Sequence, residues 1–298
     1  MSNPTPWRTA LVPASLLAAV IGWAYLPTLR FLVEKWIDDP QYSHGFLVPF
    51  ASLYLLRRAW LMGTLTAGKP QLMIGGVLLV GCIVMRWLSG GLMFHQLDAA
   101  ALLMSISASV LLFGGWSLMR GAWPAILFLI FLVPLPYELE RNVGGPLKVV
   151  AVEASTYLLQ TLGRPAIAEG NLILIDEVRL GVVDACSGLK MLMTFAAFAV
   201  GAVLLLDRTK FEKLLVILGI VPIAVIVNVV RITATGIAYT ITDDKQTLNL
   251  VHDVHGWLMM PAGLALLALQ LWTLNNLVLR PAADDREAIP AGAALMFG

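Results

Sequence analysis

Long apolar runs alternate with short polar segments along almost the whole chain. Eight runs approach the roughly 20 residues that a helix needs to cross the hydrocarbon core of a bilayer. They are Ala10–Leu29, Gly45–Leu61, Leu72–Leu88, Leu97–Leu118, Trp123–Pro136, Leu189–Leu206, Leu214–Ile237 and Trp257–Leu279. The pattern predicts an all-α polytopic membrane protein with about eight transmembrane helices in a single domain, residues 1–280. The remaining residues, 281–298, are predicted to form a flexible cytoplasmic tail.

The segment between the fifth and sixth runs, about 50 residues long, is the only sizeable part predicted to lie outside the membrane. Within it, polar residues interrupt the apolar stretch Gly144–Gly163, a pattern that favours an amphipathic helix at the membrane interface over a ninth span. The stretches Asn171–Ile175 and Val178–Val183 predict two short strands, joined by a tight turn at Asp176-Glu177. The loop is therefore expected to hold one amphipathic helix and a short β-hairpin.

Composition and charge support a membrane protein and indicate its orientation. Hydrophobic residues make up 59% of the 298 and charged residues only 13%, about half of what soluble domains contain. The formal net charge of +1 offers no basic patch for nucleic acid. If the N-terminus is cytoplasmic, inside segments carry ten Lys or Arg residues and short outside segments four. This bias predicts a multi-pass protein of the inner (plasma) membrane with both termini cytoplasmic and the long loop on the outer, extracytoplasmic face.

Three polar clusters interrupt the apolar chain: residues 184–190 around Cys186, residues 228–231 ending in Arg231, and residues 252–257 beginning with His252. The predicted topology, which uses only hydropathy and Lys/Arg counts, brings all three to the outer boundary of the bilayer. Arg231 is expected about 9 Å inside the outer end of its helix. A thiol, a guanidinium and an imidazole are the parts of a cysteine acyl-transfer site.

Arg231 is costly within a membrane span and therefore calls for a compensating role. Asn228, Arg231 and Thr235 recur at helical spacing, so they share one face and are expected to line the interior of the bundle. Two structural alternatives remain: Arg231 extends to the headgroups, or it pairs with a carboxylate such as Asp184.

Cys186 stands at a predicted helix start, where backbone N–H groups and a nearby cation favour the reactive thiolate. Cys82 lies in an apolar run and is expected to be inert, and no disulfide is predicted between two thiols in such different settings. His252 and His255 are three positions apart, a spacing that also permits a metal pair. No ligand set accompanies them, so we expect one of them to act as a general base, with no metal and no cofactor.

With these residues in view, the chain resembles the exosortase/archaeosortase family of membrane-embedded cysteine transpeptidases. Five short segments, in order between about residues 40 and 260, are similar to the motifs of that family: Tyr42–Pro49, Val133–Tyr137, Ala185–Leu189, Asn228–Arg231, and His252 with Gly256-Trp257. Lys190 stands where the family more often has Arg.

The resemblance implies a function and roles for single residues. Such proteins act on exported substrates that carry a C-terminal sorting signal: a short motif (Pro-Glu-Pro in bacteria), a transmembrane helix and a basic cluster. The substrate is transferred to an acceptor of the envelope, a lipid or glycan of unknown identity. Catalytic roles fall on Cys186, Arg231 and His252, whose distance from the Gly-Trp pair fits better than that of His255. Supporting roles fall on Asn228, Ser187, Asp184 and His44; His44 alternatively caps its helix or orients the outer loop.

Three other readings stay open at this point. A transporter or channel would use Arg231 and the outer histidines to line an ion path. A non-enzymatic scaffold in exopolysaccharide or envelope assembly would use the polar residues to hold helices together. A plain intramembrane cysteine protease would hydrolyse the acyl-enzyme instead of transferring it. The first two give the thiol no role.

Overall fold

A computed structural model of the chain describes residues 6–92, 94–175, 178–181, 189–206, 208–242 and 244–277. Helices predominate, and one small sheet accompanies them. The helices are α1 (Pro6–Ala24), α2 (Leu26–Asp38), η1 (Pro40–Phe46), α3 (Leu47–Leu61), α4 (Leu72–Leu92), α5 (His95–Phe128), η2 (Leu129–Leu132), α6 (Tyr137–Thr161), α7 (Leu189–Leu205), α8 (Lys210–Tyr239) and α9 (Lys245–Leu277). The strands are β1 (Ala166–Glu169), β2 (Leu172–Ile175) and β3 (Val178–Gly181).

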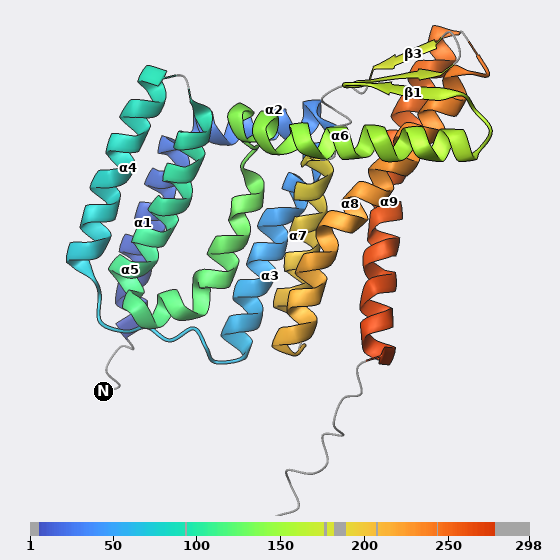
Figure 1. The fold of residues 1–298 in the computed structure, drawn as a ribbon. Helices are drawn as coiled ribbons and strands as arrows, with labels where there is room; N and C mark the ends of the chain where they lie inside the picture. Colours follow the sequence, from blue (N-terminus) through green and yellow to red (C-terminus); the bar gives the residue numbers. More distant parts are fainter. Residues whose placement is uncertain are drawn as a thin grey trace, which may run out of the picture.

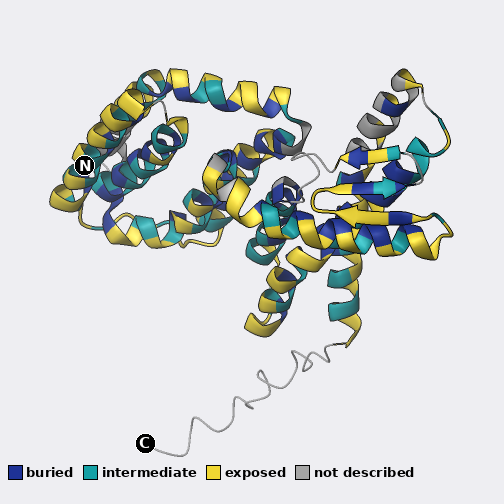
Figure 2. Ribbon diagram, turned by 45° about the horizontal axis from the view of Figure 1, so that its top comes forward, coloured by how far each residue is buried: buried dark blue, intermediate teal, exposed yellow. Residues whose placement is uncertain are grey.

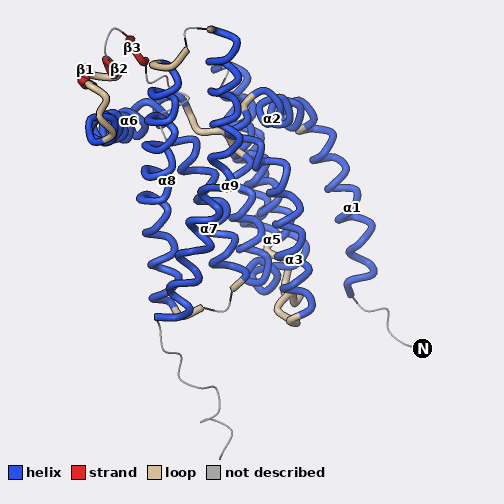
Figure 3. The backbone as a smooth tube through the Cα atoms, turned by 90° about the vertical axis from the view of Figure 1, so that its right-hand side faces the viewer, coloured by secondary structure: helices blue, strands red, loops and turns tan. Residues whose placement is uncertain are grey.

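Most helices stand side by side as a bundle, and two lie across one end of it. Figures 1 and 3 show α2 and α6 lying across the bundle at the same end, with the sheet beside α6. We call this end of the molecule the α6 end. The described chain begins with α1 and finishes with α9 at the opposite end (Figure 1). This arrangement agrees with the prediction that the start of the first span and the end of the last span lie on the same side of the membrane.

Four helical stretches are long and apolar enough to cross a membrane: Leu72–Leu92, His95–Leu132, Lys210–Tyr239 and Leu258–Leu277. A fifth is added if the bent pair α1 and α2 counts as one span. The described residues thus form a multi-pass membrane protein, and the predicted number of eight spans is not confirmed. Helix α7 is apolar but shorter, with 17 residues.

The first predicted span, Ala10–Leu29, does not continue as one straight helix. The chain bends by 63° between α1 and α2, and α2 then runs across the α6 end (Figure 3). Pro27 lies in the first turn of α2, where its missing N–H costs nothing but where it cannot continue the hydrogen bonds of α1. Hydropathy alone reads through this break because both sides are apolar.

The two predicted spans Leu97–Leu118 and Trp123–Pro136 fall within one helical stretch, α5, that is broken at Gly115. The backbone at this glycine has φ 62° and ψ −163°, a combination that is essentially restricted to glycine. In Figure 1 the chain turns at the end opposite the α6 end and returns toward α6. The Lys69 carbonyl oxygen lies only 2.0 Å from where a Cβ at position 115 would stand. The break thus depends on the absence of a side chain.

We predict that Gly115→Ala destabilises the protein by about 3 kcal/mol or more, because alanine would be forced into a strained backbone conformation and against the Lys69 carbonyl. The matched control is Gly90→Ala in α4, where nothing lies within 4 Å of the added Cβ and where alanine favours the helix. Thermal unfolding of the purified protein in detergent measures both. Equal midpoints for the two variants would contradict a strained turn at Gly115.

Helix α6 is longer than the predicted stretch Gly144–Gly163, since it begins at Tyr137, directly after the extended Pro136. The sheet also differs from the expectation of a two-stranded hairpin, because β1 adds a third strand in the order β1-β2-β3. The short β1 stretch lacks the alternation that identified β2 and β3, and its turn to β2 uses Gly170 at φ 60°. The predicted turn Asp176-Glu177 lies outside the described residues.

A hydrophobic core joins α6, the sheet and the last turns of α8. Ile173 and Ile175 of β2 are fully buried and contact a cluster that includes Val152 of α6 and Ile232 of α8. A Cβ at Gly236 of α8 would stand 2.9 Å from Ile175, so the glycine lets the helix approach the sheet closely. Figure 2 shows these contacting surfaces as buried and the opposite side of α6 as largely exposed. The sheet and α6 are therefore fixed to the end of α8.

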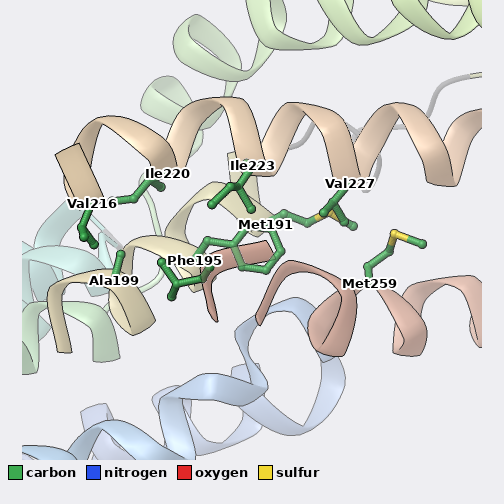
Figure 4. Packing of buried hydrophobic residues seen from close by; sticks show 10 residues of the cluster. Met191, Phe195, Ala199, Val216, Ile220, Ile223, Val227 and Met259 are labelled. Atoms are coloured by element: carbon green, nitrogen blue, oxygen red, sulfur yellow. The ribbon is translucent and has the colours of Figure 1, made fainter. Parts of the chain in front are cut away.

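A second core lies between α7, α8 and α9 (Figure 4). Phe195 of α7 packs against residues of α8 such as Ile223, and a Cβ at Gly263 of α9 would lie 2.0 Å from the Phe195 ring. Toward the α6 end, Met191 of α7, Val227 of α8 and Met259 of α9 belong to the same cluster. The three helices therefore pack together next to Asn228, where the polar face of α8 begins.

Candidate functional site

The polar face of α8 points into the protein. Asn228 is 1% exposed and Arg231 is 3% exposed, and Thr235 on the same face is also buried. A guanidinium that extended to lipid headgroups would be exposed, so this burial argues against the headgroup alternative for Arg231. Arg231 lies eight residues before the end of α8, about 12 Å along the helix axis. A buried cation at this depth needs a specific role.

The packing of α7, α8 and α9 sets the surroundings of Arg231. Val227, one turn before Arg231 on the same face, belongs to the cluster that includes Met191 of α7 and Met259 of α9 (Figure 4). On α9, His255 and His252 precede Met259 by four and seven residues, which places their backbone about one and two turns farther along the helix toward its start. The start of α7, the Asn228–Arg231 turn and the histidine turns therefore lie near the same end of the bundle.

The polar cluster around Cys186, in which the nucleophile is predicted, is not among the described residues. Asp184, Cys186 and Ser187 lie outside the described residues, so their placement stays a prediction. The chain resumes at Leu189, the first residue of α7, which is 3% exposed. The side chains of His252 and His255 are also not described, although their backbone is helical.

His44 is buried and attached to α7. It lies in η1, is 4% exposed, and its Nδ1 atom is hydrogen-bonded to Thr194 Oγ1 at 3.1 Å. Thr194 follows Leu189 by five residues on α7. His44 thus contacts the helix that follows the predicted nucleophile segment.

Two sequence segments that are far apart meet beside His44. The backbone N–H of Leu135 donates to the hydroxyl of Tyr42 at 3.3 Å, and Trp36 Nε1 donates to the Leu132 carbonyl at 3.2 Å. A Cβ at Gly45 would lie 2.4 Å from Trp36, so this turn requires glycine. The segments around Tyr42 and Leu135, noted separately in the sequence, form one contact in the structure.

Sequence reasoning missed Lys148 and Thr194. Lys148 was read as part of the polar side of an amphipathic helix, yet it is 7% exposed. It shares a helical face with Ala151, Val152 and Ser155, all of which are buried. The sequence shows this helical spacing, but a charged lysine is normally assigned to the exposed face of a helix.

No metal site is found where side chains are described: among those residues, no group of three or more His, Cys, Asp or Glu could hold a metal ion. The histidine pair of α9 and the segment around Cys186 fall outside that search. The interpretation of His252 and His255 as a metal pair is therefore not tested.

These observations define a class: a multi-pass membrane protein that gathers buried polar residues at one end of a helical bundle, beneath a flat helix and a small sheet. Comparison with known families agrees with this architecture. The family model described as transmembrane exosortase matches residues 36–269, and the chain belongs to this family. The matched range runs from the end of α2 into α9 and includes all five sequence motifs. Searches of curated proteins and of solved structures find no match.

Proposed function

We propose that this protein is a membrane-embedded cysteine transpeptidase. It cleaves the C-terminal sorting signal of exported proteins and transfers them, through a thioester, to an acceptor of the cell envelope. The observation that carries the proposal is the burial of Asn228 and Arg231 on α8 at the level where α7 begins and where α9 carries its two histidines. Membership of the exosortase family supports it.

Chain connectivity supports the participation of Cys186. Three residues of extended chain cover at most about 11 Å, and Cys186 precedes the buried Leu189 by three positions. The thiol is thus restricted to the neighbourhood of the α7 start, and Met191, two residues after Leu189, shares a cluster with Val227 of α8. Arg231, one turn after Val227 on the same face of α8, is also buried.

The proposed reaction has two halves. In the first, the Cys186 thiolate attacks the scissile carbonyl, and the C–N bond breaks to give a thioester while the helix and basic tail of the substrate leave as an amine. His252 takes the thiol proton and passes it to that amine. Arg231 stabilises the oxyanion of the tetrahedral intermediate. In the second half, an acceptor amine, or water, attacks the thioester carbonyl and releases the thiolate.

The proposed orientation rests on the Lys/Arg bias of the sequence, and it suits the proposed substrate. The α6 end faces the outer side of the plasma membrane, and both termini are cytoplasmic. A substrate tail anchored by its own transmembrane helix would then present its motif at the outer boundary of the bilayer. The single domain 1–280 would perform the whole reaction, with 281–298 as a cytoplasmic tail.

The proposal is tested by co-expression with an exported reporter that carries a Pro-Glu-Pro motif, a helix and a basic tail. We expect a shortened reporter only in cells that contain the protein, and a covalent reporter adduct on Cys186 that neutral hydroxylamine releases as a hydroxamate. A reporter that stays intact beside abundant, membrane-inserted protein would contradict the proposal. Processing without a hydroxylamine-sensitive adduct would exclude the thioester step.

The choice between the two histidines of α9 gives a separate prediction. His252→Gln is expected to lower the processing rate by about 10²–10⁴-fold, because it removes the group that carries the thiol proton. His255→Gln, in the same helix, is the matched control and should change the rate little. Processing rates measured over a pH series distinguish a general base from a structural histidine, because loss of the base flattens the pH profile. The reverse order would assign the base to His255, and no loss in either variant would remove the general base from the mechanism.

A further inference from the structure

Basic residues gather at the end of the bundle opposite the α6 end. They come from the last turns of α3, the loop before α4, the turn of α5 and the start of α8, all of which lie at this end in Figure 1. We call the following seven residues the basic rim: Arg57, Arg58, Lys69, Arg120, Arg208, Lys210 and Lys213. The chain thus concentrates cations from four segments at one level of the protein.

Carboxylates offset only part of this charge. Residues 56–71 and 112–124 contain neither Asp nor Glu. The segment that joins α7 to α8 contains Asp207 and Glu212, and Glu212 already forms an ion pair with Arg208 at 3.3 Å. Seven cations and two carboxylates leave these segments with a net positive charge, which attracts an anionic partner.

The cations of α3 and α8 lie beside the same turn. Arg58 donates to the Leu204 carbonyl at 3.0 Å, which fixes the end of α3 to the turn between α7 and α8. Its neighbour Arg57 is exposed, and so is Lys210, the first residue of α8. Lysine gains nothing from this position within the helix, because the peptide dipoles place positive partial charge on the first turn. The exposed cations therefore suit a partner outside the chain.

The apolar surface next to these cations has the length of one lipid leaflet. Lys210, Leu214 and Val221 share one face of α8, and both apolar residues are exposed. Lys210 and Val221 are about 16 Å apart along the helix axis, close to half of the roughly 30 Å hydrocarbon core. On α3, the exposed Leu53 likewise stands one turn from Arg57. A cation at the end of an exposed apolar stripe matches a phospholipid, which carries its charge at one end and its acyl chains below.

We propose that the basic rim binds an anionic phospholipid of the surrounding bilayer beside the turn between α7 and α8. The phosphate lies against Lys210 and Lys213, and an acyl chain lies along Leu214 and Val221. A soluble phosphate would use the cations alone, whereas the exposed apolar stripe favours a lipid. The inference goes beyond the transpeptidase function and does not depend on it. In the proposed orientation, the lipid belongs to the cytoplasmic leaflet.

The test uses the full chain, purified in detergent and titrated with phosphatidylglycerol or with phosphatidylcholine of the same acyl chains. Native mass spectrometry counts the lipid molecules that the protein retains, and thermal unfolding measures their effect on stability. We expect phosphatidylglycerol to be retained and to raise the unfolding midpoint, because a ligand that binds only the folded state stabilises it. Phosphatidylcholine, whose headgroup carries no net charge, should do neither.

The Lys210→Gln/Lys213→Gln double variant removes two charges of the site. One basic residue beside an anionic surface contributes about a fivefold change in affinity, so this variant should bind phosphatidylglycerol about 25-fold more weakly. Lys210→Arg/Lys213→Arg keeps both charges and should bind as the unaltered protein does. The matched control is Lys35→Gln/Arg141→Gln, which removes two exposed cations from the α6 end and should keep the affinity.

Several results would overturn the proposal. Equal retention of the two lipids would show binding without selection for charge. An unchanged affinity in the glutamine variant, or an equal loss in the control, would remove the role of the basic rim. An equal rise in the midpoint with inorganic phosphate alone would replace the lipid site by a phosphate site. If the glutamine variant does not fold, stabilisation of the unaltered protein by phosphatidylglycerol that persists in about 0.5 M sodium chloride decides against the basic rim.

Discussion

Cys186→Ala is expected to abolish processing of a sorting-signal reporter, with a loss on the order of 10⁶-fold, the scale for removal of the nucleophile in acyl transfer. The reason is chemical: without a thiolate no thioester forms, and neither Arg231 nor His252 can replace the missing bond. The variant protein should insert normally and accumulate to the usual level. Immunoblots of the reporter and of the protein, taken from the same membranes, measure both quantities.

The chain supplies a matched control in its other cysteine. Cys82 of α4 is 3% exposed and packs in a cluster with Tyr25 and Leu102. In Figure 1, α4 stands on the opposite side of the bundle from α8 and α9. Cys82→Ala should retain processing, with at most a small loss of stability from the cavity. Processing that survives in Cys186→Ala would end the cysteine mechanism and favour the transporter or scaffold reading.

Arg231→Lys is expected to give the second largest loss, about 10²–10³-fold in kcat/KM. Lysine keeps the positive charge, but it lacks the planar, forked set of donors that a guanidinium presents to a developing oxyanion. Arg231 is only 3% exposed, so the surrounding side chains fix its position. A lysine at this position has a different length and cannot move to place its charge where the guanidinium lies. The measurement is single-turnover processing in detergent or vesicles, beside a thermal unfolding curve.

Arg58→Lys is a suitable control for Arg231→Lys. Arg58 donates to the Leu204 carbonyl at 3.0 Å, at the last turn of α7 and far from its start. The same chemical change there should lower stability slightly without changing the rate. Full activity of Arg231→Lys would reduce Arg231 to a structural charge. Arg231 would also be only a structural charge if Arg231→Lys unfolded at a temperature low enough to explain its lost activity.

The interior face of α8 follows from the sequence because helical periodicity is a local property. The spacing of Asn228, Arg231 and Thr235 predicted an interior face, and all three are buried. The helical character of the chain and its exosortase membership are likewise confirmed. These features depend on residues within two or three turns of one another, which hydropathy and motif order report well.

Features that depend on contacts between distant segments were not predictable in the same way. The boundaries of the first and fourth predicted spans were missed because an apolar run does not show where a proline or a glycine breaks it, as at Pro27 and Gly115. Strand β1 is specified by pairing with β2 rather than by its own pattern. The contact of His44 with Thr194 joins residues 150 positions apart. Cys186 and its neighbours lie outside the described residues and stay a prediction.

The placement of α2 has a consequence for the lipid around the protein. The helix lies across the bundle (Figure 3), with Leu32 and Trp36 buried against the protein and Val33 and Ile37 exposed. A helix in this orientation with apolar side chains on its outer surface is suited to the boundary between headgroups and acyl chains. It can thereby fix the depth of the α6 end relative to the acyl chains.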